Sequence, residues 1–176
     1  MIHRQDTTEK KAAMVTAQMM AAAARTAPKA KGADNLEIII VEGPEKDKLA
    51  EEMRKIAKEN KAAFFERDAG NVDQAHVVFL AGTRIQTVGV AVCGYCGFKD
   101  CAENQQNNGI CTFNSGDLGL AVGSAAAVAA DHHCDNRVMF TAGKAAMLLE
   151  YFKTDVKIAY AIPLSVSGKS PFFDRK

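Results

Sequence analysis

The feature that most constrains this chain is a cluster of four cysteines, Cys93, Cys96, Cys101 and Cys111, within 19 residues. A total of five cysteines, four of them crowded together, makes a poor disulfide framework. The same crowding suits thiolate ligands of a metal in a reducing compartment. The segment that carries them must fold back on itself, because the four sulfur atoms have to reach one centre.

The spacing C-x2-C-x4-C-x9-C comes with turn residues where the chain has to reverse. Gly94 and Gly97 relieve backbone crowding around the two-residue gap, so that a tight turn can aim both flanking sulfurs inward. Residues 107–109, Asn-Asn-Gly, predict a second turn just before Cys111. This turn lets the chain deliver the fourth ligand.

Three interpretations of the cysteine cluster compete: an iron–sulfur cluster, a structural zinc site, and free or redox-active thiols. Zinc ribbons usually carry two C-x2-C pairs, whereas this chain has one. A plant-type [2Fe–2S] site has the x4 gap before the x2 gap, the reverse of this order. The pattern favours a [4Fe–4S] cluster, while spacing alone leaves a two-iron cluster and zinc open.

The fifth cysteine, Cys134, follows His132 and His133 in the string Asp-His-His-Cys-Asp at residues 131–135. One interpretation is that this string ends a buried helix, with a histidine near the negative end of the helix dipole and a buried, apolar cysteine. The alternative keeps His133 and Cys134 near the metal. We exclude Cys134 from the ligand set, because adjacent residues rarely point at the same ion.

Four stretches of the chain predict helices. The first is rich in Ala and Met and follows Asp6, which together with Glu9 is spaced like a capping box. Gly116, Gly119 and Gly123, at the start of the third, have a spacing that suits close helix packing better than a phosphate loop. The predicted helices are residues 7–26, 45–60, 117–132 and 142–152.

Four runs rich in β-branched residues predict strands, at residues 36–42, 76–82, 86–92 and 156–163. Because no helix separates the two middle runs, we expect an α+β fold with a mixed sheet flanked by helices. At 176 residues the chain suits one domain, residues 1–176, with the cysteine segment 93–116 as an irregular cluster-binding insertion. A polar tail is expected over residues 165–176.

Charge and hydropathy exclude several classes of partner. The chain has 22 basic and 21 acidic residues, a net charge of +1, which favours neither nucleic acid nor an anionic membrane surface. The N-terminus lacks the apolar stretch of a signal peptide or membrane span. We therefore expect a cytoplasmic protein that binds neither nucleic acid nor membranes.

The segment Cys93-Gly-Tyr-Cys96-Gly-Phe-Lys-Asp-Cys101 resembles the start of a four-cysteine [4Fe–4S] domain. With it, the whole chain resembles the prokaryotic family of ferredoxin-domain-containing proteins, in the order helix, Ala-Pro, strand, cysteine segment, Gly-rich helix. The resemblance implies an iron–sulfur cluster on Cys93, Cys96, Cys101 and Cys111.

The flanking regions resemble nitroreductase-type flavoproteins, through residues 23–28, 46–53 and 158–163. This resemblance implies an α+β sandwich and a homodimer that binds FMN at its interface, with Arg175 in the place of a phosphate-binding residue. Where that family has a small hydroxyl residue, this chain has Lys29, and the N-terminal basic cluster is reduced to His3 and Arg4. FMN therefore stays open, as does a phosphate-binding role for Lys29 and Lys31.

Two functions follow from these observations. The first is an iron–sulfur redox protein that passes single electrons to or from a flavin, a partner protein or a small-molecule acceptor. The second is a non-catalytic module in which a cluster or zinc ion only clamps a long loop. No hydrolase arrangement such as Ser/His/Asp or H-E-x-x-H is present.

Overall fold

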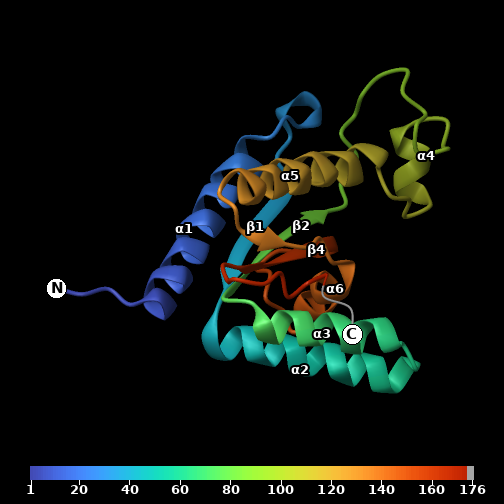
Figure 1. Cartoon of the computed structure of the whole chain (residues 1–176). Coiled ribbons are helices and arrows are strands. Elements are labelled where there is room, and N and C mark those ends of the chain that lie inside the picture. The colour runs from blue at the N-terminus through green and yellow to red at the C-terminus, as the bar shows by residue number, and fades with distance from the viewer. Residues whose placement is uncertain (174–176) are drawn as a thin grey trace.

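The computed structural model describes residues 1–173, and a four-stranded antiparallel sheet lies at its centre (Figure 1). β2 pairs with β1 on one side and with β4 on the other, and the short β3 pairs with the far end of β4. The strands, in chain order, are β1 (Leu36–Val41), β2 (Val77–Arg84), β3 (Asp135–Asn136) and β4 (Val156–Ser165).

Helices cover both faces of the sheet, because consecutive side chains of a strand point to opposite faces. In β2, Phe79 joins the core under α1 (Gln5–Thr26) and α5 (Thr112–Asp131), whereas Leu80 joins the core under three other helices. Figure 1 shows these two helical layers on either side of the strands. The three helices are α2 (Gly43–Asn60), α3 (Ala63–Gln74) and α6 (Phe140–Leu148).

The structure confirms an α+β fold with a sheet flanked by helices and corrects its strand directions. All three strand pairings among residues 1–173 are antiparallel, so the sheet is not mixed. The expected parallel pairing between strands separated by helices is absent from these residues, and residues 86–92, which were expected to be a strand, form none. β2 already has neighbours on both sides and its pairing ends at Arg84, so this apolar run cannot pair with it as a hairpin.

Helix α3 was not predicted, although its sequence carries a helical signal. Phe65, Ala69 and Val72 recur at helical spacing and all three are buried. Together α2 and α3 form a helical pair that returns the chain to the sheet beside β1. An antiparallel β1–β2 pairing results.

Several predicted boundaries move. The first helix begins at Gln5 after Arg4, without a side-chain cap, so the capping box of Asp6 and Glu9 was wrong. The predicted helix 117–132 begins five residues early, at Thr112, and 142–152 becomes Phe140–Leu148. The strand expected to end at Pro163 continues to Ser165, because β3 pairs only with the two residues after that proline.

The C-terminal segment is less polar than expected. Phe172 is 2% exposed and belongs to the core under α2, α3 and α6, and its carbonyl accepts a hydrogen bond of 3.0 Å from Arg137 Nη1. Arg175 lies outside the described residues. Within residues 1–173, no helix is both long and apolar enough to cross a bilayer.

Candidate metal centre

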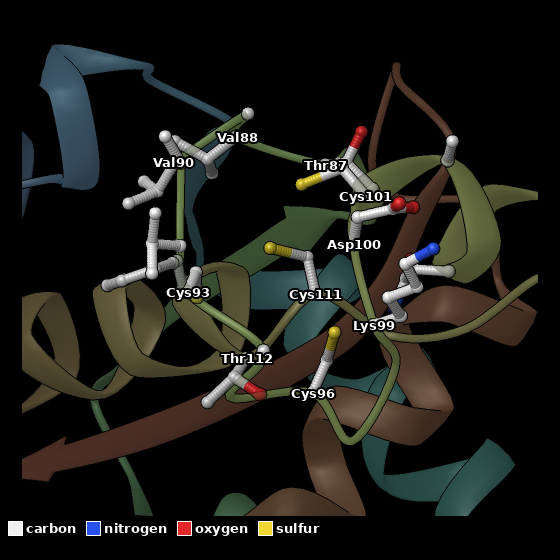
Figure 2. A pocket seen from close by; sticks show the side chains of 17 residues that line it. Thr87, Val88, Val90, Cys93, Cys96, Lys99, Asp100, Cys101, Cys111 and Thr112 are labelled. Carbon is white, nitrogen blue, oxygen red and sulfur yellow. The ribbon is translucent and has the colours of Figure 1, made fainter.

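The four clustered cysteines line one cavity of about 320 Å³ at the N-terminal end of α5. Figure 2 shows the sulfur atoms of Cys96, Cys101 and Cys111 facing a common hollow, with Cys93 on the wall across from Cys101. Cys111 is buried and the other three are partly exposed, and all four are free thiols. The fold therefore brings together the residues that the spacing singled out.

The turn between Cys93 and Cys96 forms as its glycines predict. Gly94 and Gly97 have φ values of 64° and 84°, which side chains disfavour. The N–H of Gly97 donates to the carbonyl of Gly94 at 3.0 Å and closes the turn. Tyr95 projects from it beside Phe113, with ring centroids 6.1 Å apart.

Cys101 is the first residue of a short helix, α4 (Cys101–Gln106), whose start is set by two carboxylates. Asp100 Oδ1 accepts a hydrogen bond from the N–H of Glu103 at 2.9 Å. Glu103 Oε2 in turn accepts from the N–H of Lys99 at 2.6 Å. This reciprocal capping fixes where the third cysteine leaves the loop.

Cys111 is the N-cap residue of α5, the 20-residue helix that crosses one face of the sheet. Its carbonyl accepts a hydrogen bond from the N–H of Asn114 at 3.0 Å. The positive end of a helix dipole favours negative charge within the first turn, so this position suits a thiolate. The predicted turn at residues 107–109 also forms, with Asn108 at φ 51°.

The segment before α4 is held lightly. Residues 85–100 contain no helix or strand, and none of them is buried. Its first part is fastened at three points: the N–H of Gln86 to Asn114 Oδ1 (2.8 Å), Gln105 Nε2 to Thr87 Oγ1 (2.6 Å), and Lys31 Nζ to the carbonyl of Gly89 (3.2 Å). A segment with so few buried contacts rearranges at low free-energy cost.

The donor set fits a metal cluster by its chemistry, although the side chains do not yet converge. Within residues 1–173, no three His, Cys, Asp or Glu side chains are arranged to share one metal ion. Four thiols on one cavity, three of them on or next to the lightly held segment, are nonetheless the ligands that iron–sulfur clusters use. Apolar side chains of Val88, Val90 and Phe113 line the same cavity.

Strain is concentrated next to the first cysteine. Val92, which is fully exposed, has a φ of 53°, an outlier for a β-branched residue. Such a conformation costs roughly 1–3 kcal/mol. The backbone that leads into Cys93 is therefore held in a higher-energy conformation.

Cys134 lies apart from the cavity, as the choice of ligands assumed. It is 3% exposed within the core under α1 and α5, just after α5 ends. Burial, together with the charge of Asp135, raises the pKa of its thiol to about 11. His132 is the C-cap residue of α5, and neither it nor His133 lines the cavity.

The two lysines considered for a phosphate site bind backbone carbonyls instead. Lys29 Nζ donates to the carbonyls of Arg25 and Ala27, at 2.6 and 2.8 Å, near the end of α1. Lys31 Nζ donates to Gly89, as described above. Arg4 and His3 are exposed at the other end of α1, and Figure 1 shows the N-terminus far from α4.

The sequence did not single out the polar residues around the cavity. Lys99, Asp100 and Asn104 also line it, and Asn104 is 1% exposed. A signal was present for Asn104, since it follows Cys101 by three residues and so lies one turn along the same helix.

Comparisons with known proteins identify the family of this chain. A family described as "uncharacterized protein containing a ferredoxin domain (DUF2148)" matches residues 107–175. An uncharacterized protein of Archaeoglobus fulgidus is 41% identical over 170 residues, which cover 92% of this chain and 90% of that protein.

Solved structures with the same fold are flavoproteins and nitroreductases, at low sequence identity. A BluB-like flavoprotein from Clostridium difficile 630 superposes with a TM-score of 0.56 and 16% identity, covering 92% of this chain and 84% of its own. A nitroreductase family protein from Clostridium novyi NT superposes with a TM-score of 0.58 and 16% identity, and the match covers 94% of this chain and 76% of that protein. A nitroreductase with bound FMN from Desulfitobacterium hafniense DCB-2 superposes with a TM-score of 0.57 and 14% identity, and the match covers 88% of this chain and 78% of that protein. These likenesses confirm the nitroreductase-like fold.

Proposed function

This chain belongs to the family of uncharacterized proteins containing a ferredoxin domain, and from that premise we propose that it is an iron–sulfur redox protein. The ligands are Cys93, Cys96, Cys101 and Cys111, and the cluster is [4Fe–4S]. The observation that carries the proposal is that all four thiols line one cavity while the fifth lies outside it.

When bound, the cluster supplies one-electron transfer. The chain's own residues bind it, shield it and balance its charge. The four thiolates hold the iron, and the apolar wall of Val88, Val90 and Phe113 limits the access of water. The N-terminus of α5 favours the negative charge of a thiolate at Cys111.

Loading requires the lightly held segment to close. Cys93 and Cys96 lie within or next to the turn at residues 94–97, where no residue is buried, so they can move toward Cys101 and Cys111 without disturbing either core. A rearrangement that takes Val92 out of its positive-φ conformation would also release the strain there.

Anaerobic purification tests this function. We expect a brown protein with broad absorbance at the violet end of the visible spectrum that bleaches on addition of dithionite, with iron and acid-labile sulfide in equal amounts. Replacing Cys101 by Ser removes most of the iron, whereas Cys134→Ser, the matched control, retains it. A colourless protein that contains zinc would contradict the proposal and support a structural clamp.

We include FMN as a second cofactor, with a partner protein or a small molecule as the electron acceptor. Support comes from the fold, which a nitroreductase with bound FMN shares. Lys29 and Lys31 donate to backbone carbonyls, so the proposal does not assign the phosphate site to them. A yellow flavin spectrum released by heat from the purified protein supports FMN, and its absence removes the flavin from the proposal.

The proposal also includes a homodimer formed through α5. The exposed face of this helix carries Gly116, Gly119, Leu120 and Gly123. A Cβ at any of the three glycines meets nothing within 4 Å, so the close packing expected of them is not made within residues 1–173. Because glycine costs a helix about 1 kcal/mol relative to alanine, three of them on an open face suit a second helix packed closely against it.

A cytoplasmic location completes the proposal. All five cysteines are free, which is the state that a reducing compartment maintains.

A further inference from the structure

A buried asparagine connects the third and fourth cysteines. Asn104 follows Cys101 on α4, is 1% exposed, and lines the cysteine cavity. The backbone carbonyl of Asn104 accepts a hydrogen bond from the N–H of Gly109 at 2.8 Å. Its side-chain Nδ2 donates to the backbone carbonyl of Ile110 at 3.4 Å. One residue thus reaches from the helix that begins at Cys101 to the residue directly before Cys111.

The fit around this side chain is tight. A Cβ on Gly109 would come within 2.7 Å of Asn104 Nδ2 and closer still to the ring of Phe98. The absence of a side chain at Gly109 therefore leaves room for the amide. Leucine, of similar shape to asparagine but without hydrogen-bonding groups, would fill the same space and lose the link to Ile110.

Part of the amide has no partner. Asn104 Oδ1 is buried and accepts no hydrogen bond. Leaving such an acceptor unpaired costs about 1–3 kcal/mol. The link to Ile110 therefore accounts for only part of this buried amide.

Resting on the proposed function, we infer that Asn104 is a positioning residue for the cluster. Its amide sets the separation of Cys101 and Cys111, so that both thiolates meet one cluster. Partners one layer beyond the ligands orient them, and hydrogen bonds near the sulfur atoms influence the potential. Neither Cys93 nor Cys96 has a comparable buried support, since residues 85–100 are all at least partly exposed.

The experiment compares full-length variants after anaerobic reconstitution with ferrous iron and sulfide. Asn104→Leu keeps the far-ultraviolet circular dichroism of the wild type but loses iron to a chelator roughly 10-fold more readily. Asn107→Leu is the matched control, because Asn107 is exposed on the turn after the same helix, and it retains iron as the wild type does. Asn104→Asp, which preserves size, retains the cluster and lowers its midpoint potential, because a nearby negative charge favours the oxidised form.

The outcomes separate the inference from the proposed function. If the wild type holds a cluster and both Asn104 variants match it in iron retention and potential, the inference is overturned and the function stands. If Asn104→Leu fails to fold, the potential of Asn104→Asp decides: a shift supports the inference, and an unchanged value overturns it. If the wild type takes up no cluster, both the inference about Asn104 and the proposed function are overturned.

Discussion

The carboxylate of Asp117 accepts hydrogen bonds from the backbone N–H of Ala30, at 3.2 Å to Oδ1 and 3.1 Å to Oδ2. This contact joins the first turns of α5 to the 3-10 helix Ala30–Gly32 that follows α1. Asp117 is buried, so the link is shielded from water.

Replacing Asp117 by Ala leaves the Ala30 N–H without its partner. We expect a loss of roughly 1–3 kcal/mol in the free energy of unfolding, measured by urea denaturation. Asp117→Asn, which keeps one acceptor, loses less. Equal stability of wild type and Asp117→Ala would show that the contact contributes nothing.

The raised pKa of Cys134 predicts selective alkylation. In the apoprotein near neutral pH, iodoacetamide should modify the three partly exposed cysteines and spare Cys134, whose thiol is buried and stays protonated until the pH approaches about 11. Peptide mass spectrometry of the alkylated protein measures each site. Early modification of Cys134 in folded protein would contradict its buried position.

Glu37 predicts a pH dependence of stability. Although burial opposes the shift, hydrogen bonds from the Thr154 side chain and the Lys153 and Thr154 backbone hold the pKa of Glu37 below its ordinary value of 4.5. Because the pKa is lower in the folded protein, the ionised carboxylate stabilises the fold at pH values above its pKa in the unfolded chain. This stabilisation is lost as the pH falls through its pKa in the folded protein.

The comparison is therefore between wild type and Glu37→Gln at two pH values. We expect the variant to be less stable by about 1 kcal/mol at neutral pH, and the difference to shrink as the pH falls below the ordinary pKa of the carboxyl and through its lowered folded-state pKa. Glu51→Gln, at an exposed position of α2, controls for the change of charge. A difference that grows toward low pH would have the wrong sign.

The open face of α5 predicts the effect of filling it. Gly123→Leu should reduce the dimer fraction in sedimentation velocity, because the side chain occupies the space left for a second helix. Gly70→Leu, on α3, should leave the dimer intact, although a Cβ at Gly70 likewise meets nothing within 4 Å. A monomeric wild type that Gly123→Leu only stabilises, by about 1 kcal/mol, would remove the dimer from the proposal.

Local patterns were enough to predict most elements of this fold. The β-branched runs at residues 36–42 and 156–163 and the helix over residues 7–26 formed within a few residues of the expected limits. The apolar run 86–92 did not, because both sides of the preceding strand β2 are already paired, and composition does not report such tertiary pairing. Its valines line the cavity instead.

The sequence likewise predicted some residues of the candidate site and missed others. Cysteine spacing and Gly94 and Gly97 predicted which residues gather, because turn geometry is local. Asn104 could not be found by that reasoning, since its importance depends on burial and on contact with Ile110 across a turn. The metal ligands themselves remain a prediction.

The absence of any buried residue in 85–100 also bears on the order of assembly. Zinc fingers need their metal in order to fold, because the metal replaces a core. Here neither core contains a residue of this segment, so removal of the cluster that we propose should leave both cores folded. Under the proposed function, cluster insertion would then be a step separate from folding of the chain.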